Sequence, residues 1–281
     1  MNREVDALTS ATLKHLRDRW WDDIFTGFVR DTVQPRAGQK ILDVGCGTGT
    51  AEVKLSRLRI SQVDIFAVDL VLERVAQARA TAQSHNIRAS FAAADASALP
   101  FTDGAFDSAF CVAVLQHLGD VATAVKELAR VTRPGGRVVA VEPDNGGRYF
   151  YSSSDAGKRA YETAGQFFAS VARARGDATE PTVGPKLPAL FAESGITPLD
   201  VHIFPVSRAQ LGAPPAAVWE ERRQTVHAAI ERAPDEAIRR LGRDYLKLLE
   251  RYAQEAKTAG RAFVEIQNTM LFATVGQRAE A

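Results

Sequence analysis

From about Lys40 to Asp144, short runs rich in β-branched residues alternate with stretches whose apolar residues recur at helical spacing. This alternation is typical of right-handed βαβ units, which build a parallel sheet with helices on its faces. We expect strands at Lys40–Val44, Val63–Val68, Ala89–Ala93, Phe106–Cys111 and Arg137–Glu142. The sequence therefore predicts an α/β fold around a doubly wound, mostly parallel sheet.

Past Asp144 the alternation stops, and polar, aromatic and glycine residues mix. We expect loop and helix at Gly146–Lys186, a short helix at Pro188–Ser194, a strand at Val201–Val206, helices over Pro214–Gly260 and a last, antiparallel strand at Thr269–Val275. Because no linker separates the helical segments from the rest, we interpret residues 1–281 as a single domain. Residues 38–145 are its predicted core, and residues 146–186 and 209–262 are predicted helical cap insertions.

The composition limits the partners and the setting of this chain. Its 281 residues are 46% hydrophobic, and no apolar run approaches the roughly 18 residues that a membrane span needs. The net charge of +1, without a basic cluster, argues against a nucleic acid as partner. Residues 1–20 do not resemble a secretory signal and the chain has two cysteines, so we expect a reducing, cytoplasmic setting. No cluster with metal-ligand spacing is visible, and we expect no metal.

A glycine-rich turn follows the first predicted strand, in the sequence Asp43-Val44-Gly45-Cys46-Gly47-Thr48-Gly49-Thr50. Glycines at alternate positions let the backbone adopt positive φ and approach a ligand closely. The dinucleotide fingerprint would need glycine where Thr50 stands, and the Asp43 carboxylate would repel a pyrophosphate. The turn therefore favours a ligand with positive charge over a dinucleotide.

This turn resembles motif I of the class I S-adenosylmethionine (SAM)-dependent methyltransferases. Further landmarks of that family are matched, in the same order along the chain, by Asp69, Asp95, Phe106–Phe110 and Arg133–Gly136. The resemblance covers residues 38–145 closely and implies a Rossmann-like core with the same strand order as the doubly wound folds. Beyond Asp144 it carries no information on the substrate.

The resemblance implies SAM as the cofactor and S-adenosylhomocysteine as its product. It assigns the two ribose hydroxyls to Asp69 and the adenine amino group to Asp95, because carboxylates accept hydrogen bonds from such donors. The residues implied in cofactor binding are Asp43, Gly45, Cys46, Gly47, Gly49, Asp69, Leu70, Asp95, Ala96 and Cys111. The alternative for the turn and Asp69 is a tight bend with ordinary surface carboxylates, and Asp95 could instead cap a turn.

An acceptor site is expected at the carboxyl ends of the fourth and fifth strands. His117 is a candidate general base there, because imidazole titrates near neutrality, with a packing role as the alternative. The candidate acceptor-binding residues are Trp21, Glu142, Arg148, Tyr149 and Trp219. Aromatic residues of a cap can wall an apolar pocket or simply pack on the core, and the sequence leaves both open. Arginines between residues 222 and 243 alternate with acids, which favours a solvated face over an anion site.

Together these features predict an enzyme that transfers the methyl group of SAM to oxygen, nitrogen or carbon of a small-molecule acceptor by in-line displacement. Methylation of a protein or an RNA is an alternative, and a basic groove would distinguish it. A module that binds SAM or its demethylated product without catalysis is another. A dinucleotide-dependent dehydrogenase shares the predicted fold. A monomer and a homodimer are both compatible with the sequence.

Overall fold

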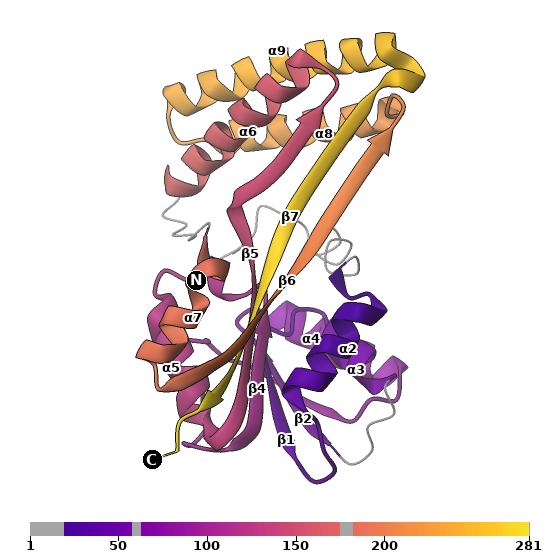
Figure 1. The fold of residues 1–281 in the computed structure, drawn as a ribbon. Coiled ribbons are helices and arrows are strands. Elements are labelled where there is room, and N and C mark those ends of the chain that lie inside the picture. The colour runs from indigo at the N-terminus through magenta and orange to yellow at the C-terminus, as the bar shows by residue number, and fades with distance from the viewer. Residues whose placement is uncertain (1–19, 58–62, 175–181, 281) are drawn as a thin grey trace. The chain divides into compact units, whose positions relative to one another are not determined.

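A computed structural model describes residues 20–57, 63–174 and 182–280 (Figure 1). Residues 1–19 lie outside the described part of the chain. The prediction that these residues are not a secretory signal therefore falls outside the described residues. The chain divides into two compact units. Unit 1 comprises Met1–Gly146, Glu180–Val206 and Met270–Ala281, and unit 2 comprises Gly147–Thr179 and Ser207–Thr269.

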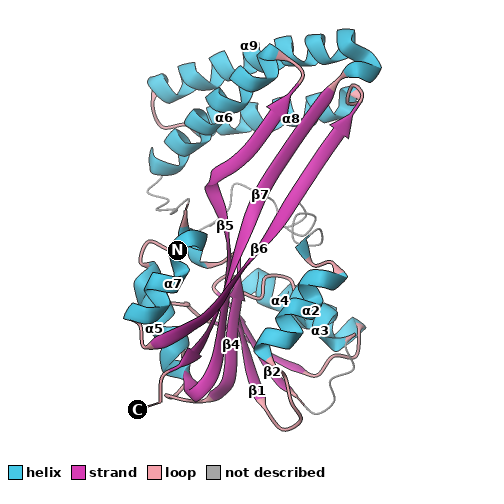
Figure 2. Ribbon diagram, in the orientation of Figure 1, coloured by secondary structure: helices cyan, strands magenta, loops and turns pink. Residues whose placement is uncertain are grey.

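Unit 1 is built on a sheet whose strand order is β3-β2-β1-β4-β5-β7-β6 (Figure 2). The strands are β1 (Lys40–Val44), β2 (Asp64–Asp69), β3 (Ala89–Ala93), β4 (Phe106–Val112), β5 (Thr132–Ser152), β6 (Ile196–Leu211) and β7 (Val264–Arg278). The strands from β3 to β5 in this order pair in parallel, and Figure 2 shows β7 running against its neighbours. The predicted α/β class, a mostly parallel sheet with an antiparallel last strand, is confirmed.

Helices cover both faces of the unit 1 sheet (Figure 1). One face carries α2 (Asp23–Val33), α3 (Thr50–Ser56) and α4 (Leu72–Ser84), and the other carries α5 (Val121–Val131) and α7 (Val183–Glu193). Alternate residues of β1 divide between the two faces, because side chains alternate along a strand. Ile41 packs with the α2 and α3 residues, whereas Leu42 packs with those of α5 and α7.

The bounds of α5 follow directly from its sequence. Asp120 precedes the helix and its carboxylate accepts the backbone N–H of Thr123 at 3.0 Å, which is the geometry of a helix N-cap. Ala124, Val125 and Leu128 recur at helical spacing and are buried against the sheet. Cap and periodicity therefore agree on a helix that begins at Val121 and ends at Val131.

The three strands that follow α5 are longer than predicted. β5 continues from Glu142 to Ser152, where the sequence predicted a loop. Its extension alternates little between buried and exposed residues and carries glycines, so the period-two signal is missing there.

The helix α7 also differs from its prediction. It begins at Val183, five residues before the predicted start, and Pro188 lies inside the helix. The first turns of the helix before Pro188 were therefore missed from the sequence.

Unit 2 holds three long helices packed on one another (Figure 1). They are α6 (Asp155–Ala174), α8 (Ala216–Arg232) and α9 (Glu236–Ala259), followed by the short 3₁₀ helix η2 (Gly260–Ala262). A Cβ at Gly242 of α9 would lie 2.4 Å from the side chain of Ile230 and 2.8 Å from that of Phe167, so glycine permits this close approach of the helices. None of the described helices is both long and apolar enough to cross a bilayer.

A buried ion pair lies inside unit 2. Arg222 donates to both oxygens of Glu265, at 3.1 and 2.9 Å, and stacks over the Trp219 ring at 4.8 Å. The Tyr252 hydroxyl donates to the same carboxylate at 2.5 Å. Burial raises the pKa of Glu265, but the Arg222 hydrogen bonds and charge outweigh it and hold the pKa below its ordinary value. Arg222 is thus a packed residue, unlike Arg223, which pairs with the exposed Glu220 on the surface as predicted.

Replacing Arg222 by Met is expected to lower the stability of unit 2 by about 3 kcal/mol at pH 7, because it leaves a buried carboxylate without its cation. The lowered pKa of Glu265 means that the wild-type pair stabilises the fold above the unfolded-state pKa and loses this contribution as the pH falls. The difference between the proteins should therefore shrink at pH 4. Hydrogen exchange of the α8 and α9 amides in the intact chain measures it. Arg223→Met is the control, and an equal loss in both variants would contradict this account.

Candidate functional site

Three acids predicted to bind the cofactor lie along one edge of the sheet. Asp43 is the penultimate residue of β1, Asp69 ends β2, and Asp95 follows β3 by two residues. The three strands are parallel neighbours, and their register pairs Val44 with Val68 and Asp69 with Ala93. Because parallel strands end at the same edge, the three carboxylates come from adjacent positions at the crevice side of the sheet.

The glycine-rich turn between β1 and α3 depends on left-handed backbone. Gly45, Gly47 and Gly49 have φ of 80°, 58° and 88°. The N–H groups of Gly45 and Cys46 both donate to the Val68 carbonyl, at 2.7 and 2.9 Å, which ties the turn to β2. Residues other than glycine rarely adopt such φ values, so the sequence pattern is a direct requirement of the turn.

The Asp69 carboxylate is buried and holds two segments of the site. Its Oδ2 accepts the N–H of Gly47 and its Oδ1 accepts that of Val71, each at 2.9 Å. Each carboxylate oxygen can accept about two hydrogen bonds, so capacity remains on both for a ligand with paired hydroxyl donors. Leu70, which follows, is 51% exposed and offers an apolar surface beside this carboxylate.

Asp95 is exposed and organises its own turn. Its Oδ1 accepts the N–H of Ser97 at 2.8 Å, and its carbonyl accepts that of Ala98 at 3.0 Å. Ala96 is buried beneath it. The turn-capping role considered from the sequence is therefore present, and it leaves the other carboxylate oxygen available to a ligand.

Cys111 lies at the carboxyl end of β4 with no exposed surface. Burial, together with the negative charges of Glu142 and Asp43, raises the pKa of this thiol well above its ordinary value. A thiol held neutral in the core is a poor nucleophile, and the contact with the cofactor predicted for Cys111 stays a prediction. Cys46 is likewise a buried thiol, and its predicted contact with the cofactor also stays a prediction.

The Glu142 carboxylate binds the backbone of the turn after β4. Its Oε1 accepts the N–H groups of Val114 and Leu115 at 2.8 and 2.7 Å, and its Oε2 accepts that of Gln116 at 3.2 Å. These donors open the 3₁₀ helix η1 (Leu115–His117), on which the half-buried candidate base His117 lies. A fully buried Glu142 thus positions the segment that carries His117, and its predicted contact with an acceptor stays a prediction.

Glu142→Gln is expected to lower the free energy of unfolding by about 2–3 kcal/mol, because one amide oxygen and one NH₂ group replace the acceptors of three backbone donors. Thermal unfolding of the intact chain measures the change, with the exposed Glu250→Gln as control. Unchanged stability combined with lost acceptor binding would contradict the positioning role and support direct contact with the acceptor.

The remaining predicted acceptor residues are divided between the two units. Trp21 is buried in the unit 1 core, where its ring packs edge-on against Phe25 at 4.9 Å and its carbonyl accepts from Lys54 of α3 at 2.6 Å. Arg148, Tyr149 and Trp219 belong to unit 2. Tyr149 is exposed, whereas Trp219 is buried against Tyr252. Packing accounts for the two tryptophans, and the acceptor roles of all four residues stay predictions.

Several residues that shape the site were not identified from the sequence. Val114 packs so closely on the turn that a Cβ at Gly45 would lie 2.2 Å from its Cγ2. Ala113, just before it, has a left-handed φ of 56°, which is strained for alanine. Gln116 accepts a hydrogen bond from Asn145 at 2.7 Å. No local sequence signal marks these contacts, because each joins segments that are distant along the chain or uses an unusual backbone angle.

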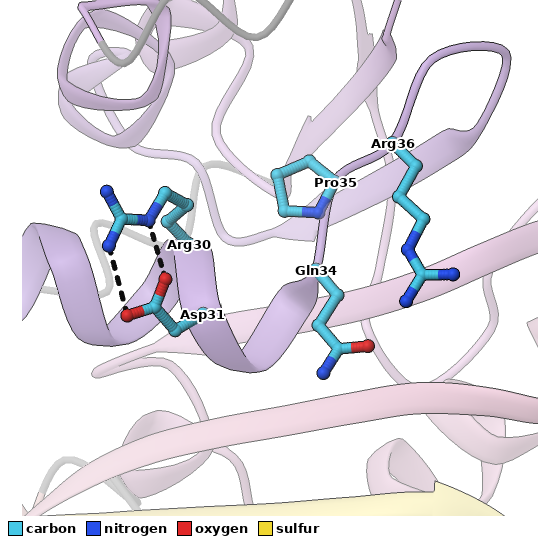
Figure 3. Close-up of a pocket in the computed structure, with 5 residues that line it drawn as sticks. All are labelled: Arg30, Asp31, Gln34, Pro35 and Arg36. Atoms are coloured by element: carbon cyan, nitrogen blue, oxygen red, sulfur yellow. Dashed lines mark hydrogen bonds and ion pairs between the residues drawn. The ribbon is translucent and has the colours of Figure 1, made fainter.

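A surface pocket lies at the opposite end of β1. Arg30, Asp31, Gln34, Pro35 and Arg36 line it, from the end of α2 and the loop before the strand (Figure 3). Arg30 and Asp31 are paired with each other at 2.6 and 3.0 Å. Because the glycine-rich turn follows the carboxyl end of β1, this pocket is separate from the candidate cofactor site.

Known protein families and relatives match the region of the chain that contains the candidate cofactor site. Residues 42–140 match the family described as "Methyltransferase domain". An O-methyltransferase of Penicillium expansum, cnsE, is 35% identical over 120 residues, which cover 43% of this chain and 44% of the relative. The demethylmenaquinone methyltransferase of Beutenbergia cavernae is 33% identical over 135 residues, covering 48% of this chain and 52% of that protein. The matches thus span about half or less of these relatives.

Solved structures extend the likeness to most of the fold. A putative methyltransferase from Bacillus halodurans C-125 aligns with a TM-score of 0.58 and 17% sequence identity. The alignment covers 91% of this chain and 99% of that one. At this identity the likeness establishes the fold, and the chemistry has to be argued from the site residues.

Proposed function

We propose that this chain, whose residues 42–140 match a methyltransferase domain family, binds SAM and transfers its methyl group to a small-molecule acceptor. One observation carries the proposal. Three carboxylates lie at or just after the carboxyl ends of three adjacent parallel strands, and the turn that follows the first of these strands has glycines with left-handed φ. This edge is rich in acceptors and negative charge, so it suits a ligand with an ammonium group, a sulfonium and a ribose diol.

The described residues fit the parts of SAM. Asp69 retains acceptor capacity for both ribose hydroxyls, and the exposed Leu70 can cover an apolar face of the adenine. Asp95 offers a carboxylate oxygen to the adenine amino group, and the buried Asp43 supplies negative charge beside the turn. When bound, SAM supplies a methyl group already activated by its sulfonium charge. The residues of this chain therefore chiefly bind, orient and exclude water.

A small-molecule acceptor is supported by the named activities of the relatives, which act on compounds such as demethylmenaquinone. We place the acceptor near η1, because His117 lies there on the segment held by Glu142, next to the turn through Val114. His117 would take a proton if the acceptor is a hydroxyl or an ammonium group.

The proposal is tested by incubating the protein with methyl-labelled SAM and a metabolite extract, and then separating small molecules, protein and RNA. We expect label in a small molecule that mass spectrometry can identify. His117→Gln should lower the rate of that transfer without changing the affinity for SAM. Label confined to protein or RNA would contradict the acceptor class, and SAM binding without any transfer would contradict catalysis.

A further inference from the structure

The last strand of the unit 1 sheet has an open edge. Among the residues that the structure describes, β6 pairs with β7 on one side only, because it ends the strand order. An edge strand presents unpaired N–H and C=O groups to which another strand can add. Along this edge Leu199, Val201 and Ile203 are 48%, 40% and 52% exposed. A run of apolar side chains this exposed on an edge strand marks an interaction surface.

The two faces of this stretch of β6 differ. His202 and Phe204 pack against Phe28 of α2, with ring centroids 4.8 and 5.0 Å apart. Val201 and Ile203 alternate with them, so their side chains lie on the face away from α2. The Val201 N–H donates to the carboxylate of Asp200 at 2.8 Å. The Val201 N–H is therefore bonded to a side chain and not to a neighbouring strand. This N–H accordingly belongs to the open edge of β6.

We propose that this edge joins two copies of the chain by antiparallel pairing of β6 about a two-fold axis at Val201. This register places Leu199 opposite the partner's Ile203 and Val201 opposite the partner's Val201. On the other face it places Asp200, whose Oδ2 lies 3.0 Å from Nε2 of His202 in its own chain, opposite the partner's His202. Apolar residues therefore meet apolar residues, and an acid meets an imidazole, in pairs that stabilise antiparallel sheets.

Other registers are less complementary. An axis at Asp200 would bring two carboxylates together, and a shift by one residue would place apolar side chains opposite polar ones. Pro205 lacks an N–H and ends the ladder beyond Phe204. A self-paired edge closes on itself, so the expected product is a dimer and not a fibre.

The test is sedimentation of the intact chain over about 1–200 μM, a range that brackets interfaces of modest size. The wild type is expected to form dimers within it. Val201→Lys and Val201→Asp should each raise the dimer dissociation constant by at least about tenfold, because the substituted charge faces its own copy across the axis. An equimolar mixture of these two variants should dimerise again, since a Lys then faces an Asp.

Ile24→Lys, at an exposed apolar residue of α2, is the matched control and should dimerise like the wild type. A wild type that stays monomeric over the whole range would overturn the proposal. So would dimers that persist in both Val201 variants, or a mixture that remains monomeric. Titration with SAM is a separate measurement, so failure here is distinguishable from failure of the proposed function.

Discussion

Asp69→Asn is expected to weaken SAM binding by about 100-fold, because two hydrogen bonds from the ribose hydroxyls to a charged acceptor are lost or weakened. The Asp69 oxygens already accept the N–H groups of Gly47 and Val71, and asparagine can keep only one of these bonds. The variant therefore also loosens the glycine-rich turn. Calorimetric titration with SAM measures the affinity, and circular dichroism checks that the chain is folded.

The matched control for this prediction is Asp64→Asn at the other end of the same strand. Asp64 is half exposed and lies 3.6 Å from Arg88 in a surface ion pair, which contributes little to stability. SAM affinity should change by less than about twofold in this variant. An equal loss of affinity in both variants would mean that general charge, and not the position of Asp69, attracts the cofactor.

Gly45→Ala is expected to lower the free energy of unfolding by about 3 kcal/mol and the melting temperature by about 10 °C. Two effects add. The φ of 80° is strained for alanine, and the new Cβ would lie 2.2 Å from Cγ2 of Val114. Val114 also belongs to the segment whose backbone donates to Glu142. The substitution should therefore disturb the glycine-rich turn and the η1 segment together.

Two further variants separate strain from overlap. Gly38 has a similar φ of 82°, but a Cβ there meets no atom within 4 Å, so Gly38→Ala should cost only the strain, about 1–2 kcal/mol. The double variant Gly45→Ala/Val114→Ala lacks the Val114 methyl groups that would collide with the new Cβ. The part of the stability loss that exceeds the loss in Gly38→Ala should therefore be recovered. Equal destabilisation by Gly38→Ala and Gly45→Ala would contradict the packing of Val114 on the turn.

The sequence predicts the inner strands of the fold well. β1 and β3 occupy the predicted residues, β2 is shifted by one residue at both ends, and β4 is one residue longer at its end, because these strands are short and bounded by clear turns. The later strands were underestimated for a physical reason. Beyond Glu142 in β5 the exposed residues no longer alternate with buried ones, and a strand without a buried face leaves no periodic signal.

In the candidate site, too, some features were predicted from the sequence and others were not. The predicted acids and glycines lie along one edge of the sheet, because their positions depend on strand ends and on φ, which local sequence can indicate. The contacts made by Val114, Ala113 and Glu142 depend on tertiary packing between β1, β4 and β5. A single sequence does not show such pairs directly, and the family match at residues 42–140 lies within unit 1, so it names no acceptor contact in unit 2.

Calorimetric titration of the intact chain with SAM, S-adenosylhomocysteine and NAD⁺ tests the central claim most directly. We predict saturable binding of one molecule of SAM or of S-adenosylhomocysteine per chain, with competition between them, and no binding of NAD⁺. The acids at the ends of β1, β2 and β3 are the reason for this selectivity. Neither heat nor a thermal shift with the two sulfur ligands, or saturable binding of NAD⁺ in their place, would contradict it.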